Sequence, residues 1–389
     1  MEGSGFFAYK KGAVKFEEAE AVFRKWLYLD HDPDILRILF AIYLANKYDG
    51  LPVWAMFIGK PGCGKSELLS ALTDVDNTVM VSTLTMNALA SGYKDGENSL
   101  LHQLKDNKIL IVKDMSTFTE MQPDARAVIF STLRDAYDGY YVKRTGTGNI
   151  EWRGKFGVLG GATPAIEKIR SYDAALGERF LSIKFRTTDG SEELIQERSM
   201  ANSIRQTVMK KAIKDCTISF FNEAKINKDN LLPQPIINAV MHSARAMVKA
   251  RSSVSRDRFT RDVDEMVSTS EVPTRVTSQL LLIARACLDI GTEDATTIRI
   301  VQRCCLDSVP SIRVQIMKRL IEGAERTDDL RGLVRLSKPV IDRALEDMWF
   351  LRLVSKDKGA NWAVIDKAME EILINTGTAI AIPKNCDPL

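Results

Sequence analysis

Eight residues near the start of the chain have the types and the spacing needed to bind a nucleoside triphosphate. Residues 59–66 read Gly-Lys-Pro-Gly-Cys-Gly-Lys-Ser and fit the pattern Gly-x-x-x-x-Gly-Lys-[Ser/Thr]. In such a P-loop the glycines let backbone N–H groups surround a phosphate, the lysine neutralises phosphate charge, and the hydroxyl binds Mg²⁺. Residues 53–58 predict a strand before the loop and residues 67–72 a helix after it, as this motif requires. We therefore expect ATP and Mg²⁺ to bind through Gly59, Pro61, Gly62, Cys63, Gly64, Lys65, Ser66 and Glu67.

A second apolar run ends in an acid that could complete this site. Residues 109–112 predict a buried strand, and Lys113 and Asp114 follow it. We expect Asp114 to join Ser66 in holding Mg²⁺, through a water molecule. Many P-loop ATPases place a glutamate directly after this aspartate to polarise the attacking water, but here the next residue is Met115.

The missing glutamate leaves three explanations open. Asp114 itself takes the position of the base, with Lys113 displacing the usual acid, or Glu120 reaches in from the following turn. In the third explanation hydrolysis is slow and the protein is a nucleotide switch. The catalytic candidates are therefore Lys65, Asp114 and Glu120, together with an arginine described next.

Two polar residues stand beside later predicted strands. Thr163 follows the strand 156–160, where it is a candidate to sense the γ-phosphate; it is also a suitable helix N-cap before Pro164. Arg179 directly precedes the strand 180–185 and is a candidate arginine finger for the ATP of a neighbouring subunit. The alternative for Arg179 is a salt bridge with Glu178 or another acid.

The pattern along the chain indicates several structural units. With 389 residues, the chain exceeds the size of one hydrophobic core. Short strand-like runs alternate with helical stretches across residues 51–190, which predicts an α/β P-loop domain with a parallel sheet and helices on both faces. Residues 1–50 read as a helical lead-in, and helical periodicity without strands across residues 191–309 predicts an all-α lid containing one long helical stretch at 192–221.

Composition excludes some classes of protein. The six cysteines and three histidines show no metal-binding spacing, and a net charge of +3 does not by itself indicate a nucleic-acid partner. The longest apolar stretch, 38–45, is too short to span a membrane, and the N-terminus lacks the order of a signal peptide. We therefore expect no membrane partner and a cytoplasmic location.

Residues 310–370 carry an independent pattern, that of a winged helix. Two amphipathic helices precede a third that opens at Ser337, and a predicted β-hairpin follows. In this arrangement the third helix enters the DNA major groove, and Lys338, Arg343, Lys356 and Lys358 would contact phosphates. Winged helices also serve as protein-interaction modules, and residues 371–389 read as a C-terminal tail.

The ordered motifs resemble the AAA+ superfamily, and within it the minichromosome maintenance helicase branch, across about residues 51–309. Residues 139–148 resemble the hairpin that these helicases place before the sensor strand, so Lys143 and Arg144 would contact DNA in a central channel. Residues 176–180, Leu-Gly-Glu-Arg-Phe, resemble the Ser-Arg-Phe motif. Residues 273–275 resemble the Thr-x-Arg segment, which implies that Arg275 is a lid residue contacting the nucleotide phosphates. The absent glutamate, and the absence of a recognisable oligonucleotide-binding barrel or zinc ribbon before the P-loop, depart from the pattern.

Together these features predict an ATP-dependent DNA-binding protein that forms a homo-oligomer, as a hexameric ring or a spiral. Its function would be that of a replication helicase or an origin-binding initiator, with single- or double-stranded DNA near Lys143 and Arg144. Tyr140 and Tyr141 would stack on single-stranded DNA in this interpretation, or pack in the core in the alternative. The second class is a nucleotide-gated binding module, such as a helicase loader, transcriptional regulator or defence switch. A small-molecule kinase ranks last, because it explains nothing after residue 311.

Overall fold

The fold is built on a five-stranded parallel sheet in a computed structural model that describes residues 15–90, 99–105, 107–145, 148–170, 179–188, 190–228, 231–256, 263, 272–324 and 326–376. The strand order is β2-β3-β6-β1-β7. The strands are β1 (Trp54–Ile58), β2 (Thr78–Val81), β3 (Lys108–Val112), β6 (Phe156–Ala162) and β7 (Phe180–Lys184). All neighbouring strands are parallel. The predicted parallel α/β sheet is therefore confirmed.

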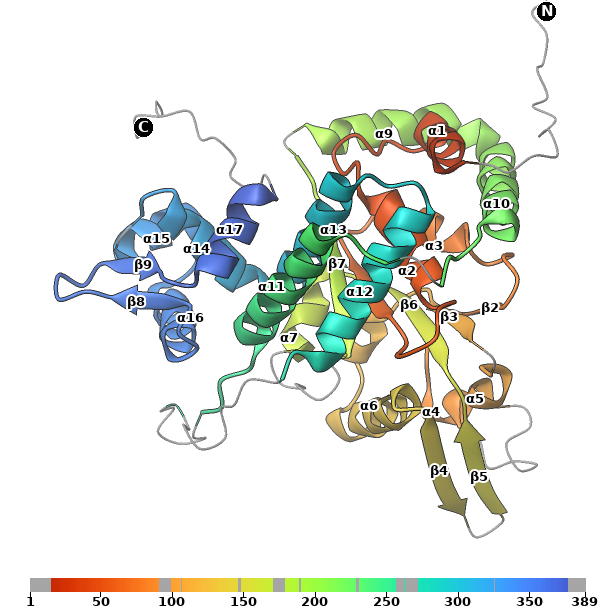
Figure 1. Ribbon diagram of the computed structural model, residues 1–389, viewed down its shortest axis with the longest axis horizontal. Coiled ribbons are helices and arrows are strands. Elements are labelled where there is room, and N and C mark those ends of the chain that lie inside the picture. Colours follow the sequence, from red (N-terminus) through yellow and green to blue (C-terminus); the bar gives the residue numbers. More distant parts are fainter. Residues whose placement is uncertain are drawn as a thin grey trace, which may run out of the picture.

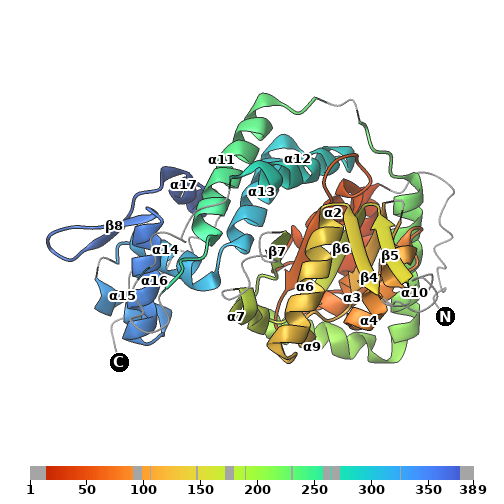
Figure 2. The same cartoon turned by 90° about the horizontal axis from the view of Figure 1, so that it is seen from below.

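Helices cover both faces of this sheet (Figures 1 and 2). Along β1, Ala55 and Phe57 belong to one buried cluster, which includes α2 (Ile35–Ala45) and α3 (Lys65–Ser70). Trp54, Met56 and Ile58 point to the opposite face and pack under α6 (Pro123–Tyr137). Because successive side chains of a strand alternate, a strand covered on both faces is apolar throughout, and β1 is buried at every position.

Short elements and one hairpin complete the sheet domain. The short helices are α4 (Met86–Leu89), α5 (Leu100–Gln103), α7 (Glu167–Arg170), and the 3-10 helices η2 (Ser116–Thr119) and η3 (Pro164–Ile166). Strands β4 (Tyr140–Thr145) and β5 (Gly148–Arg153) form an antiparallel hairpin between β3 and β6 in the chain. Figure 1 shows this hairpin projecting from the end of the sheet domain.

A group of helices follows β7, where helical periodicity predicted them. They are α9 (Ser191–Asn202), η4 (Ser203–Arg205), α10 (Gln206–Glu223), α11 (Gln234–Arg251), α12 (Thr274–Asp289) and α13 (Asp294–Ser308). The long helical stretch expected at 192–221 is instead divided at η4. Asn202, the last residue of α9, donates from Nδ2 to the carbonyl of Trp26, which ends α1 (Phe16–Trp26), at 2.6 Å. This contact anchors the corner between α9 and α10.

A buried ion-pair network joins α13 to the sheet domain. Arg303 on α13 and Asp32 have no exposed side-chain surface and form a direct ion pair. Arg303 also pairs with Asp307, with Nε and Oδ2 3.3 Å apart. Burial by itself disfavours the charged guanidinium, but the nearby Asp32 and Asp307 carboxylates outweigh it and raise the pKa of Arg303. For the carboxyl of Asp307, burial is the largest influence, and it raises the pKa.

The remaining helices and two strands form a C-terminal unit (Figure 1). Its elements are α14 (Ser311–Ile321), α15 (Thr327–Val334), α16 (Lys338–Phe350), β8 (Val354–Lys356), β9 (Trp362–Val364) and α17 (Lys367–Asn375). β8 and β9 pair antiparallel, so three helices precede a hairpin, in the order expected from the sequence. The expected boundary at residue 370 falls inside α17, which packs against α11 and α13. The helix was not expected from the sequence.

Candidate functional site

The P-loop lies directly after β1, between the ends of the neighbouring strands β6 and β7. Gly62 and Gly64 have φ angles of 81° and 89°, a left-handed conformation that side chains with a Cβ rarely adopt. At Gly59 the obstacle is space, because an added Cβ would lie 2.9 Å from Cβ of Phe185. Gly62 and Gly64 are thus required by the backbone conformation of the loop, and Gly59 by the lack of space beside Phe185.

The side chain of Lys65 is held against the loop by hydrogen bonds to backbone carbonyls of the loop. Its Nζ donates to the carbonyl oxygens of Gly59 and Lys60, at 2.6 and 2.7 Å. A lysine ammonium has three donors, and these contacts keep it at the mouth of the loop. Lys60, which precedes the turn, instead forms an exposed pair with Glu192 on α9, with Nζ and Oε1 2.5 Å apart.

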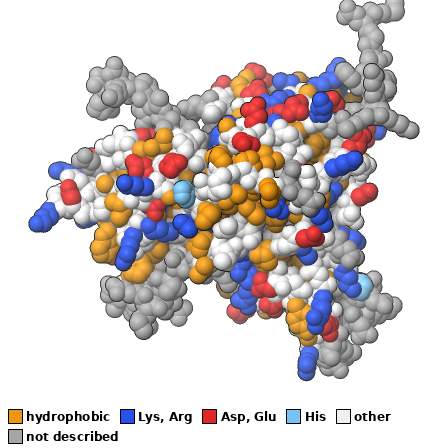
Figure 3. Space-filling view, viewed as in Figure 1, with side chains coloured by type: hydrophobic (Ala, Val, Ile, Leu, Met, Phe, Trp, Pro, Cys, Tyr) orange, Lys and Arg blue, Asp and Glu red, His pale blue; other side chains and the backbone are white. Residues whose placement is uncertain are grey.

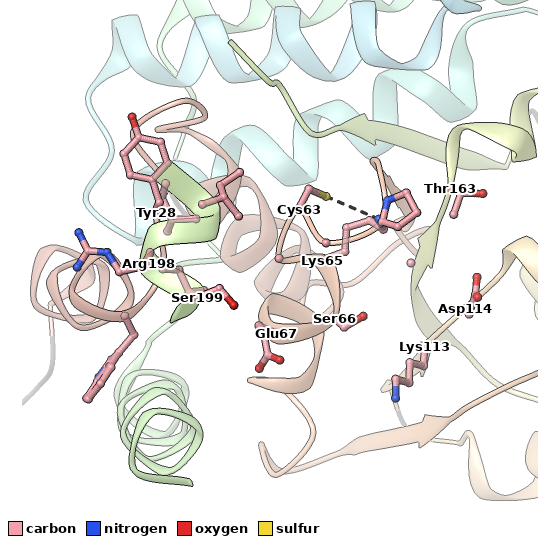
Figure 4. A pocket seen from close by; sticks show the side chains of 18 of the residues that line it. Tyr28, Cys63, Lys65, Ser66, Glu67, Lys113, Asp114, Thr163, Arg198 and Ser199 are labelled. Atoms are coloured by element: carbon pink, nitrogen blue, oxygen red, sulfur yellow. Dashed lines mark hydrogen bonds between the residues drawn. The ribbon is translucent and has the colours of Figure 1, made fainter. Parts of the chain in front are cut away.

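A cavity of about 730 Å³ opens over this loop (Figure 4). It is lined by Trp26, Leu27, Tyr28, Leu29, Pro61, Gly62, Cys63, Gly64, Lys65, Ser66, Glu67, Ser82, Thr83, Lys113, Asp114, Thr117, Gly161, Ala162, Thr163, Ile195, Arg198, Ser199, Asn202, Gln206 and Met209. The volume is within the range of small-molecule sites. The predicted residues from Pro61 to Glu67, with Asp114 and Thr163, therefore share one cavity, whereas Gly59, directly after β1, is not part of its lining.

Two residues of the cavity lining, Asp114 and Thr163, are linked by hydrogen bonds through Ser116, which is not itself part of the lining. The backbone N–H of Ser116 donates to Oδ1 of Asp114 at 2.8 Å. The Ser116 hydroxyl in turn accepts from the backbone N–H of Thr163 at 2.8 Å and donates to its Oγ1 at 3.1 Å. Ser116 was not singled out from the sequence, because serine is common in turns and its partner is 47 residues away.

Three predicted catalytic or phosphate-binding residues lie outside the lining of this cavity. Glu120 is exposed at the end of η2. Arg179 is buried and pairs with Asp138, with Nη2 and Oδ2 2.9 Å apart. The guanidinium carbons of Arg179 and Arg275 lie 5.6 and 5.8 Å from the centroid of the Tyr137 ring. The structure thus gathers two predicted arginines around one buried tyrosine, away from the P-loop of the same chain.

Other lining residues come from segments that the sequence did not mark. Residues 26–29 form one wall, and Arg198, Ser199 and Asn202 of α9 form another (Figure 4). Arg198 donates from Nη1 to the carbonyl of Lys25 at 2.9 Å, so the two walls are bonded to each other. No local pattern could have revealed this, because the contact joins residues 173 positions apart.

The donor set at the cavity fits a magnesium ion that arrives with a nucleotide. Among the described residues no group of three or more His, Cys, Asp or Glu side chains could hold a metal. Mg²⁺ with a nucleotide needs less, since it keeps several waters and binds one or two protein oxygens besides the phosphates. Among the lining residues, the hydroxyl of Ser66 and the carboxylates of Glu67 and Asp114 are side-chain oxygens that suit that purpose.

The hairpin presents two different faces. Tyr141 is 6% exposed and packs in the core with Ile150 and Trp152, whereas Tyr140 is 44% exposed. Arg153, opposite Tyr140 in the register, places its guanidinium 4.5 Å from the centroid of that ring. Lys143 follows the alternation of Tyr141 and is half-buried, whereas Arg144 follows Tyr140 and is exposed.

One tyrosine thus packs as expected for a core residue and one is available at the surface. Figure 3 shows hydrophobic and basic side chains next to each other at this projecting end of the molecule. The two basic residues predicted to contact DNA face opposite sides of the hairpin. Successive side chains of a strand point to opposite faces, so the sequence alone could have predicted that Lys143 and Arg144 face different sides.

The four basic residues predicted to contact DNA in the C-terminal unit are all exposed. They are Lys338, Arg343, Lys356 and Lys358. Lys338 lies near Asp328, with Nζ and Oδ1 3.5 Å apart, and Lys356 places its Nζ 5.1 Å from the centroid of the Trp362 ring. The exposed acids Asp342 and Glu346 on α16 reduce the positive charge of the same helix.

Comparison with protein-family models and with curated proteins finds no match to this chain. Within the part of the chain that the structure describes, no helix is both long and apolar enough to cross a membrane. The interpretation of the cavity therefore depends on its own residues and geometry.

Proposed function

We propose that this protein binds and hydrolyses ATP in the cavity above β1. The observation that carries the proposal is that Lys65, Ser66, Asp114 and Thr163 line one cavity at the carboxyl ends of β1, β3 and β6. Ligands of open parallel sheets bind at this edge, and phosphoryl transfer requires a lysine, a metal-binding hydroxyl and an acid around the phosphates. Lys65 would neutralise the phosphates, and Ser66 would hold the Mg²⁺ that reduces their charge.

The proposed class is AAA+, with resemblance to the minichromosome maintenance branch. The position of the β4–β5 hairpin between β3 and β6 supports this, as does the group of helices after β7, which we propose to be the lid. The order α14, α15, α16, β8, β9 supports a winged helix at the C-terminus.

DNA is the proposed macromolecular partner. Exposed Tyr140 and Arg144 on the hairpin combine a stacking surface with a charge that can pair with phosphate. The basic side chains of the C-terminal unit would add contacts to the duplex backbone, which carry affinity and little sequence information. A replication helicase or an origin-binding initiator uses both kinds of contact.

A homo-oligomer is part of the proposal because two predicted nucleotide-binding arginines lie away from the P-loop of their own chain. Arg179 and Arg275 share the Tyr137 ring and do not line the cavity. Burial raises the pKa of the Tyr137 hydroxyl, and the two arginines, which lower it, do not outweigh burial. In a ring or spiral, this face would meet the ATP of the neighbouring subunit, and Arg179 would exchange Asp138 for the phosphates.

The test is steady-state ATP hydrolysis by wild type, Lys65→Ala and Arg179→Ala, with and without single- and double-stranded DNA. We expect DNA to stimulate the wild type and both variants to be inactive. Mixing the two variants should restore part of the activity, because Lys65→Ala subunits supply Arg179 to the intact P-loops of the other variant. Lack of any ATP binding by the wild type would refute the proposal.

A second candidate is a nucleotide-gated binding module with slow hydrolysis. One observation favours it: the side chain of Met115, which takes the place of the usual glutamate, is completely buried. The same assay separates the candidates, because a gated module would hydrolyse ATP slowly whether or not DNA is present. In that case nucleotide would change the oligomeric state, which analytical ultracentrifugation with ADP and with a non-hydrolysable ATP analogue would reveal.

A further inference from the structure

The end of β3 determines which positions can bring an acid to the phosphates. Lys113 and Asp114 both line the cavity, but the chain turns after them and Met115 points away. Met115 is 0% exposed and packs closely over Gly160, where an added Cβ would lie 2.0 Å from its Sδ. A carboxylate at position 115 would be buried in that apolar cluster. The two positions available for a pair of acids are therefore 113 and 114, and the chain places lysine and aspartate there.

Strand alternation assigns the two side chains to different sides of the sheet. Ile109 and Ile111 pack in the cluster that contains Leu68 and Leu69 of α3, the helix that begins at Lys65. Lys113 continues that alternation, toward the side of Ser66. Leu110 and Val112 pack in the opposite cluster, and Asp114 continues theirs.

The view into the cavity agrees with this assignment. In Figure 4 the Asp114 carboxylate lies nearer Thr163 than the Lys113 side chain does, and the Lys113 ammonium points away from Thr163. The hydrogen bond from the Ser116 N–H fixes one Asp114 oxygen at 2.8 Å and leaves the other free of that contact. Thr163, bonded to Ser116, is the residue expected beside the γ-phosphate.

We propose that Asp114 is the general base for ATP hydrolysis and that Lys113 occupies the place beside Ser66 where an acid usually holds the metal. This inference rests on the proposed ATPase function and assigns roles within that site. The free oxygen of Asp114 accepts one proton from water as the water oxygen forms a bond to the γ-phosphorus. The bond from the γ-phosphorus to the β,γ-bridging oxygen breaks, its electrons leave with ADP, and the other product is inorganic phosphate.

Lys113 has a distinct consequence for nucleotide binding. Lys113 adds a second ammonium to the lining of the cavity besides Lys65. Such a charge neutralises phosphate charge directly and repels a divalent cation. We therefore expect ATP to bind this protein with less dependence on Mg²⁺ than in a site where an acid holds the ion.

The experiment measures the Kd for ATP, with Mg²⁺ and with EDTA, together with single-turnover hydrolysis. The variants are Asp114→Asn, Lys113→Ala and Lys113→Asp, with Asp124→Asn as a control for an exposed aspartate outside the cavity. A general base contributes about 10²- to 10⁴-fold, so Asp114→Asn should reduce hydrolysis by at least about 100-fold. Its Kd values, with and without Mg²⁺, should remain within about threefold of wild type, since the proposed role lies in proton transfer.

The lysine variants test the second part through binding alone. Lys113→Ala should weaken ATP binding in EDTA by about tenfold, the loss of one charge-assisted contact of about 1.5 kcal/mol. Lys113→Asp should bind ATP weakly in EDTA and regain affinity when Mg²⁺ is added, because it supplies the acid that the ion prefers.

Several outcomes overturn the inference while leaving the proposed function intact. The first such outcome is that Asp114→Asn hydrolyses ATP at the wild-type rate. The second is that the Kd of Asp114→Asn for ATP no longer depends on Mg²⁺, which would make Asp114 a metal ligand. Loss of hydrolysis in Glu120→Gln with full activity in Asp114→Asn would assign the base to Glu120. Failure of the wild type to bind ATP would instead refute the proposed function itself.

Discussion

The buried pair of Asp32 and Arg303 offers the sharpest test of how the parts of this protein are held together. Neither side chain has any exposed surface, and the carboxylate of Asp32 accepts hydrogen bonds from both terminal nitrogens of Arg303. Asp32 also accepts from the backbone N–H of Arg186 at 3.0 Å. Arg303 also donates to the carbonyl of Lys184 in β7 at 3.1 Å. The pair therefore joins α13 to the end of β7 and to the segment that follows residues 26–29, which line the cavity.

Asp32→Asn removes the negative charge and preserves the shape of the side chain. Removing one partner of a buried pair leaves an uncompensated charge and costs about 3–5 kcal/mol. With an m value of about 3 kcal/mol/M in urea, this lowers the unfolding midpoint by about 1–1.7 M. Arg303→Met should be at least as destabilising, because it leaves the carboxylates of both Asp32 and Asp307 in the interior.

The assay is urea unfolding followed by tryptophan fluorescence, with Asp30→Asn as the matched control. Asp30 is two residues away and also pairs with an arginine, Arg24, but its side chain is 68% exposed. An exposed pair contributes about 0–1 kcal/mol, so the control midpoint should shift little. If Asp32→Asn unfolds within about 1 kcal/mol of the control, the argument from burial is refuted.

Three further predictions concern pH, nucleotide and DNA. Asp34 is 8% exposed and pairs with Arg299. Burial raises the pKa of this carboxyl, but the arginine outweighs burial, so the pKa is lowered from 3.8. The stabilising contribution of Asp34 is therefore complete above pH 3.8 and is lost as the pH falls through the lower pKa of the folded state. Urea midpoints measured as the pH falls from about 5 to 2 should therefore decrease less steeply in Asp34→Asn than in wild type, and parallel curves would contradict the assignment. Lys65→Ala should weaken ATP binding by about 10- to 100-fold in calorimetry, the loss of a charge-assisted contact, whereas Lys60→Ala should change it by less than about threefold because its pair with Glu192 is exposed. Arg144→Ala should reduce the slope of log K against log salt for DNA by about 0.7–0.9, and an unchanged slope would remove this residue from the DNA contact.

Local patterns predicted the P-loop and most strands because each depends on residues close in sequence. The left-handed glycines at 62 and 64 belong to the motif itself. Strand β3 contains the run 109–112 expected from its apolar residues, and two helices precede the third helix of the C-terminal unit, as expected. The interruption of the helix at 203–205 was missed, because α9 reads as a good helix and its end is held by a contact with Trp26.

Residue roles that depend on distant partners were predicted less completely. Arg179 precedes a strand, as a finger would, but its burial against Asp138 and Tyr137 arises from packing between α6 and β7. The wall formed by residues 26–29 and Arg198 has no motif. Its existence depends on the fold that brings α1 and α9 together over the P-loop.

The sequence by itself determined that a loop with the P-loop motif follows a buried strand, since glycine φ angles, one lysine and one hydroxyl are local requirements. It also determined the parallel sheet, because alternating strands and helices bury apolar faces in few other ways. The tertiary structure alone decided which acid at the end of β3 faces the cavity: the backbone buries Met115 against Gly160 and leaves Asp114 in the lining. This difference arises from close packing between strands that are far apart in the chain, so it cannot be predicted from the spacing of residues along the sequence.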